Sequence, residues 1–187
     1  MGRLISCEEN FRALSILRGN GMKQRILSML VDNTSGVLSR VAGLFSRRSY
    51  NIDSLTVGVT ADPRYSRMTV VATGDDAVLD QIMKQLAKLV DVRAIKILDP
   101  TDSVHRELML IKVKADAKER QTVISCTDIF RAKIVDVAPD SLIVEMTGTQ
   151  TKLDAFLRLL DGYEILEIAR TGITGLSRGL GDVVYLD

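Results

Sequence analysis

Several residue types that carry chemistry are scarce in this sequence. Its 187 residues include no tryptophan, one histidine and two cysteines, and aromatic residues make up 4%. The shortage of aromatic rings argues against a base-stacking platform for nucleic acid. A formal net charge of +1 argues against electrostatic binding to a polyanion. The two isolated cysteines, Cys7 and Cys126, suggest no disulfide framework and a reducing compartment, so we expect a cytoplasmic protein.

Long apolar runs are also missing. No run approaches the roughly 20 residues that a membrane span requires. The first 21 residues lack the clean apolar region of a signal peptide. They carry only a weak apolar pattern, which Gly19, Asn20 and Gly21 interrupt, so we predict a poorly ordered leader over residues 1–21. A folded unit is expected from Met22 onward.

The inventory of catalytic groups is thin. The only histidine, His105, lies in a predicted linker beside Arg106, where a solvated side chain is the usual case. Cys126 lies on a predicted apolar helical face, which is typical of a small core residue. No spacing of cysteine or histidine residues indicates a metal site. We therefore predict no catalytic residue and no metal ligand, and favour binding over catalysis.

From Met22 the apolar pattern is regular. Alternating apolar residues predict strands, and apolar residues three or four positions apart predict helices. The expected elements are a strand over 25–31, a helix over 37–48, strands over 55–59 and 68–72, a helix over 78–89 and a strand over 92–98. This β-α-β-β-α-β order is that of a ferredoxin-like unit.

The same order recurs after a short linker at residues 99–103. Its elements are a strand over 108–113, a helix over 123–130, a hairpin of strands 133–137 and 142–146, a helix over 153–160 and a strand over 165–169. We therefore predict an α+β fold of two tandem ferredoxin-like βαββαβ modules, over residues 22–99 and 104–171. Residues 172–187 are a glycine-rich tail without the ending of a nucleotide P-loop, interpreted as mobile or as a docking segment.

A polar stretch, Asp32 to Gly36, joins the first predicted strand to the first predicted helix. The first N–H groups of a helix lack internal partners, and the helix dipole favours negative charge there. The stretch therefore suits a small anion such as a carboxylate. A plainer interpretation stays open, in which Asn33 shapes a turn, Thr34 or Ser35 caps the helix and Gly36 relieves crowding.

The sequence from Arg25 to Val57 resembles an ACT domain, and more narrowly the small regulatory subunit of acetohydroxyacid synthase, also called acetolactate synthase. The resemblance runs from about Met22 to Gly179. Four further pieces that fit the family are residues 62–69, 85–92, 107–113 and 170–179. One departure is Ser49, which stands where the family often has glycine.

This resemblance implies a non-catalytic regulatory subunit in the biosynthesis of valine, leucine and isoleucine. Such a subunit binds and activates a separate catalytic subunit and confers feedback inhibition by valine. Thiamine diphosphate, Mg²⁺ and FAD are then expected in the catalytic partner, with no cofactor in this chain. One alternative is an ACT module that senses an amino acid for a different enzyme. A small enzyme on the same scaffold is a further alternative, against which the thin catalytic inventory argues.

The valine-binding positions of the family carry over onto Asn33, Gly36 and Asn51. Backbone N–H groups at the helix start would hold the ligand carboxylate, and the asparagine oxygens would accept from its ammonium group. Leucine and isoleucine side chains nearby would form an apolar wall for the isopropyl group. The predicted valine-binding residues are Asn33, Gly36, Val37, Leu38, Asn51 and Ile52.

Asn33 precedes the first predicted helix and Asn51 follows it. A helix of about 12 residues is roughly 18 Å long, so one valine cannot reach both ends. We therefore predict a homodimer in which the edge strands that follow Asn51 pair antiparallel across a two-fold axis. Each of two equivalent sites would combine Asn33 of one chain with Asn51 of the other.

Overall fold

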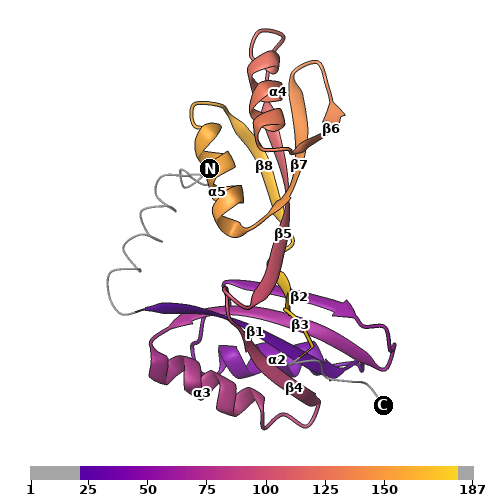
Figure 1. Cartoon of the computed structure of the whole chain (residues 1–187), viewed down its shortest axis with the longest axis vertical. Coiled ribbons are helices and arrows are strands. Elements are labelled where there is room, and N and C mark those ends of the chain that lie inside the picture. Colours follow the sequence, from indigo (N-terminus) through magenta and orange to yellow (C-terminus); the bar gives the residue numbers. More distant parts are fainter. Residues whose placement is uncertain (1–21, 181–187) are drawn as a thin grey trace. The chain divides into compact units, whose positions relative to one another are not determined.

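The computed structural model describes residues 22–180, which form two compact units divided between Asp99 and Pro100 (Figure 1). Each unit contains an antiparallel sheet and two helices in the order β-α-β-β-α-β, with one additional strand in the second unit. The predicted α+β fold of two tandem ferredoxin-like modules is confirmed. The predicted leader and residues 181–187 of the predicted tail lie outside the described residues.

The first unit is built around the central strands of its sheet. Its elements are β1 (Lys23–Asp32), α2 (Val37–Ser46), β2 (Ser54–Val59), β3 (Tyr65–Gly74), α3 (Asp76–Leu86) and β4 (Val92–Leu98). The strand order is β2-β3-β1-β4, so β2 and β4 are the edges. Alternate residues of a strand share one face, and Leu27, Met29 and Val31 of β1 accordingly lie in one buried core with apolar residues of α2 and α3.

The two helices of this unit begin differently. Asp75 caps α3 because its carboxylate accepts a hydrogen bond from the Val78 N–H at 2.7 Å. Helix α2 begins after Gly36 with no side-chain cap. After α2, Ser49 has a φ of 56°, a left-handed conformation in which a side chain is strained and glycine is not. That conformation explains why glycine suits this position.

The second unit repeats the arrangement and extends it. Its elements are β5 (Ser103–Lys114), α4 (Arg120–Ile129), β6 (Lys133–Val137), β7 (Ser141–Gly148), α5 (Gln150–Leu159), β8 (Ile165–Arg170) and β9 (Thr174–Ser177). The strand order is β6-β7-β5-β8, with β9 paired to β5. Arg170 pairs with Met109 and Thr174 with Arg106, so β9 continues along β5 where β8 stops.

Two predictions about the ends of the second unit are wrong. The strand predicted from residue 108 begins at Ser103, so His105 lies in a strand and not in a linker. In the predicted tail, Thr174–Ser177 form strand β9, so the mobile interpretation is wrong for these residues, while docking to a partner stays a prediction. Both differences have one physical cause. Residues 103–106 and 174–177 supply backbone hydrogen-bond partners to each other, and a pairing between segments so far apart leaves no local pattern in the sequence.

Candidate functional site

The stretch from Asp32 to Gly36 ends in a glycine with a left-handed backbone. Gly36 is the N-cap of α2 and has a φ of 87°, which a residue with a Cβ adopts only under strain. Neither Thr34 nor Ser35 caps the helix, so that part of the plainer interpretation is wrong. A Cβ built on Gly36 would lie 3.1 Å from Nη1 of Arg40. The backbone conformation therefore favours glycine here, and a Cβ would also require the Arg40 guanidinium to shift slightly.

Asn33 ties this loop to the turn between β2 and β3. Its backbone N–H donates to the Arg64 carbonyl at 2.7 Å, and its Nδ2 donates to the Pro63 carbonyl at 2.9 Å. Its Oδ1 accepts from the Ser66 hydroxyl at 3.1 Å. Asn33 thus shapes the loop, as the plainer interpretation held. Because an amide oxygen has two lone pairs, Oδ1 retains capacity for one further donor.

The start of α2 offers backbone donors at the surface. The Val37 N–H makes only a long contact of 3.5 Å with the Thr34 carbonyl. Within residues 22–180, the Leu38 N–H donates to no protein acceptor, as expected in the first turn of a helix. Leu38 is 46% exposed as a residue, whereas Val37 is 4% exposed and belongs to the core. Val37 therefore offers a ligand its backbone and not its side chain.

Arg40, one turn into α2, lies over the same glycine. Its Nε donates to Oδ2 of Asp91 at 2.6 Å, and its Nη2 donates to Oδ1 of Asp91 at 2.9 Å. The side-chain hydrogen bond with Asp91 raises the pKa of Arg40 above its usual value. The Asp91 carbonyl also accepts from the Asp32 N–H at 2.9 Å. This pair connects α2 to the loop before β4 and holds the guanidinium beside Gly36.

Sequence reasoning did not find Arg40 or Asp91. A partial signal is present, because Arg40 lies four residues after Gly36, and residues at that spacing are neighbours on a helix surface. The partner Asp91 lies far along the chain, between α3 and β4. Only the tertiary structure brings the carboxylate to the guanidinium.

Asn51 and Ile52 lie beyond the other end of α2. Asn51 Nδ2 donates to Oδ1 of Asp53 at 2.7 Å, and Oδ2 of Asp53 accepts from the Thr73 hydroxyl at 2.6 Å. Ile52 is half-buried and packs against the core of the first unit. The Asn51 side-chain oxygen accepts no hydrogen bond within the described range 22–180.

Within one chain the structure does not bring the predicted residues together. Asn33 is bonded to Ser66 near the start of β3, whereas Asp53, close to Asn51, is bonded to Thr73 near the end of β3. A strand rises about 3.3 Å per residue, which places Ser66 and Thr73 about 23 Å apart. Asn33, Gly36, Val37 and Leu38 thus form one group, and Asn51 and Ile52 form another.

Residues 22–180 meet the requirements of neither a metal site nor a membrane-spanning helix. This range contains no group of three or more histidine, cysteine, aspartate or glutamate residues placed to hold a metal ion. None of its helices has the length and apolar character needed to cross a membrane.

Comparisons with known proteins match both units to the same kind of protein. Residues 27–94 match the family described as AHAS small subunit-like ACT domain, and residues 106–179 match the family described as small subunit of acetolactate synthase. A probable acetolactate synthase small subunit of Methanothermobacter thermautotrophicus is 54% identical over 155 residues, covering 82% of this chain and 92% of that protein. The acetolactate synthase isozyme 3 small subunit of Escherichia coli is 53% identical over 157 residues, covering 83% and 96%.

A solved structure shares the architecture. The crystal structure of the acetolactate synthase small subunit from Thermotoga maritima superimposes with a TM-score of 0.78 at 42% sequence identity. It covers 84% of this chain and 99% of that one. The similarity therefore includes both units.

Proposed function

Because this chain belongs to the family of acetolactate synthase small subunits, we propose that it is the non-catalytic regulatory subunit of a cytoplasmic acetolactate synthase. It would bind and activate a separate catalytic subunit and confer feedback inhibition by valine in branched-chain amino-acid biosynthesis. Thiamine diphosphate, Mg²⁺ and FAD would belong to the catalytic partner. The residues of this chain would bind the amino-acid effector only.

The proposed valine site lies at an interface between two copies of the first unit. The observation that carries this proposal is the separation of about 23 Å that β3 imposes between the surroundings of Asn33 and those of Asn51. One valine can contact both asparagines only if they come from different chains. The loop at Gly36 would then receive the carboxylate, and Asn51 of the second chain would accept from the ammonium group.

The free edge of β2 supports the pairing of two chains. β2 ends the sheet, and Val57 and Val59 on it are exposed. The Thr60 N–H donates to the Tyr65 carbonyl, and hydrogen-bonded pairs alternate along antiparallel strands. The N–H groups of Leu55, Val57 and Val59 therefore point away from β3. An antiparallel second β2 strand would satisfy them and cover the edge.

Mixing two variants that each bind valine weakly tests whether the site is interfacial. Asn33→Ala and Asn51→Ala are each expected to weaken valine binding in full-length protein, measured by isothermal titration calorimetry. If the sites are interfacial, a mixed dimer contains one site with both asparagines and one with neither. Mixing the two variants, with subunit exchange verified by mass spectrometry, should therefore restore binding to about half of the mixed dimers' sites. If each site lay within one chain, mixing would restore nothing.

The alternative, an amino-acid-sensing module for a different enzyme, differs only in partner. Adding the purified chain to an acetolactate synthase catalytic subunit, with and without valine, separates the two. Activation that valine reverses is the expected result for the proposed function. Valine binding by the chain without any effect on that catalytic subunit would favour the alternative.

A further inference from the structure

Arg40 is held in place with one of its three nitrogens unused. The carboxylate of Asp91 engages Nε and Nη2, at 2.6 and 2.9 Å. Within the described part of the chain, Nη1 has no acceptor. Asp91 itself is largely buried and is tied to β1 through its backbone carbonyl. The Asp91 carboxylate thus fixes the orientation of the guanidinium. In this orientation the Nη1 N–H groups point away from Asp91.

The unused nitrogen lies against the loop that the proposed function assigns to the effector. A Cβ placed on Gly36 would be 3.1 Å from Nη1, so this nitrogen lies directly over the N-cap of α2. The one acidic residue of the stretch from Asp32 to Gly36, Asp32 itself, already receives two hydrogen bonds from Arg93, at 2.7 and 2.5 Å. No acid of the loop is therefore left to occupy Nη1.

We propose that Arg40 supplies the charged donor that selects an α-carboxylate at this loop. The inference rests on the proposed function, since it assigns a residue to the same site. The ligand class is a small free amino acid, whose carboxylate would lie between Nη1 of Arg40 and the first N–H groups of α2. A guanidinium gives charge-assisted hydrogen bonds, which are stronger than those from neutral donors. Asp91 acts as the positioning residue because it fixes the guanidinium.

A neutral analogue of the ligand tests this role. Valinamide keeps the ammonium and isopropyl groups of valine and lacks the carboxylate. Calorimetric titration of the full chain should show that valine binds more tightly than valinamide. Replacing Arg40 alone would leave Asp91 buried without a partner, so the test uses the double variant Arg40→Gln/Asp91→Asn. In that variant the preference for valine over valinamide should fall by about tenfold or more.

Arg47, the C-cap residue of α2, provides a matched control. It follows Gly43 at the same four-residue spacing, and its Nη1 lies 3.4 Å from a Cβ built on that glycine. Arg47→Gln should leave the ratio of the two affinities unchanged. An equal fall in Arg47→Gln and in the double variant would overturn the inference, because the loss would then not be specific to the guanidinium over Gly36.

Two further results decide the remaining cases. An unchanged ratio in the double variant, with wild-type valine binding intact, overturns the inference and leaves the proposed function standing. A wild-type chain that binds no valine overturns both. If circular dichroism shows that the double variant does not fold, Arg40→Lys replaces it. Lysine keeps the charge near Asp91 but lacks the third nitrogen over Gly36, so the ratio should again fall, and an unchanged ratio refutes the role.

Discussion

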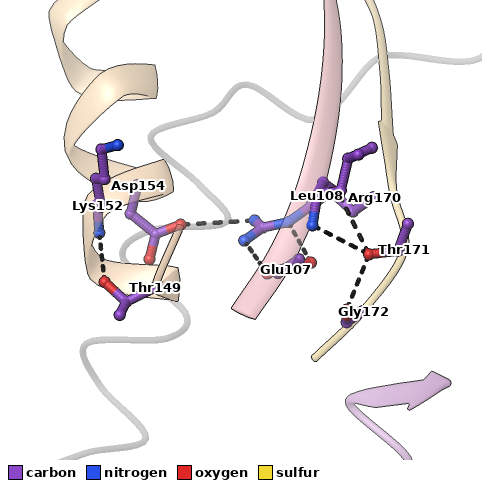
Figure 2. A network of polar contacts seen from close by, with 8 residues as sticks. All are labelled: Glu107, Leu108, Thr149, Lys152, Asp154, Arg170, Thr171 and Gly172. Atoms are coloured by element: carbon purple, nitrogen blue, oxygen red, sulfur yellow. Dashed lines mark hydrogen bonds and ion pairs between the residues drawn. The ribbon is translucent and has the colours of Figure 1, made fainter. Parts of the chain in front are cut away.

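Glu107 of β5, a buried residue of the second unit, accepts two hydrogen bonds from Arg170 of β8, each of 2.9 Å. The Glu107 side chain is 6% exposed, at a position that continues the core-facing row of Met109, Ile111 and Val113 along the same strand. Figure 2 shows that Asp154 of α5 approaches the same guanidinium, at 3.5 Å. One arginine therefore joins two strands and a helix at the point where β8 ends.

Loss of Arg170 should destabilise the protein strongly. Arg170→Met leaves the buried Glu107 carboxylate without its partner, and an uncompensated buried charge costs about 3 kcal/mol or more. Urea unfolding measures the loss. The double variant Glu107→Gln/Arg170→Met should recover much of it, because no charge remains buried. Lys114→Met removes the exposed ion pair with Glu164 and should cost far less stability than Arg170→Met. Equal losses in both single variants would contradict this account.

Proline at position 57 should separate the proposed dimer. The Val57 N–H points away from β3, so Val57→Pro removes a donor from the free edge and none from the bonds between β2 and β3. Sedimentation equilibrium should then detect monomers, while circular dichroism shows a retained fold. Val57→Ala, which keeps the N–H, should remain dimeric. A dimer that survives the proline would show that chains associate elsewhere.

Replacing Gly36, the N-cap of α2, and Gly43, inside α2, by alanine should have opposite effects on stability. Gly36→Ala places a Cβ on a left-handed residue beside Arg40, and should cost about 1–2 kcal/mol of stability and weaken valine binding. Gly43 lies inside the helix, where alanine is favoured over glycine by up to about 1 kcal/mol. Thermal unfolding of both variants checks the difference. Similar melting temperatures for the two would argue against strain at Gly36.

The ion pair between Asp32 and Arg93 should make stability depend on pH in acid. Hydrogen bonds from Arg93 lower the pKa of Asp32 below its usual value. The stabilisation is therefore present above the ordinary carboxyl pKa of about 4 and is lost as the pH falls through the lower, folded-state value. Arg93→Gln should unfold at lower urea concentration than wild type at pH 7, and the gap should narrow below about pH 4.

An arginine whose hydrogen-bond partner is neutral provides the control for this pH effect. Arg48 donates to the side-chain amide of Gln85 at 3.1 Å, and no carboxylate takes part in that bond. The difference in unfolding free energy between Arg48→Gln and wild type should therefore be the same at pH 7 and in acid. If the Arg93→Gln gap were equally constant, the ion pair would not be its source.

The sequence alone determined most of the fold. Apolar periodicity sets which face of each strand and helix is buried, and this is a local property of the chain. It therefore predicted both βαββαβ orders, and the stretch from Arg25 to Val57 with four further pieces was enough to indicate the family. The helix between the two asparagines also predicted their separation, which the contacts along β3 reproduce.

Only the tertiary structure decided the contacts between distant residues. Strand β9, the pairing of Arg40 with Asp91 and the burial of Glu107 beside Arg170 each join segments far apart in the chain. Long-range hydrogen bonds and ion pairs depend on how the packed elements meet, and no local periodicity encodes them. The left-handed backbone of Gly36 lies between these two cases: a glycine before a helix suggests this conformation, and the structure shows it. The guanidinium above it is known only from the fold.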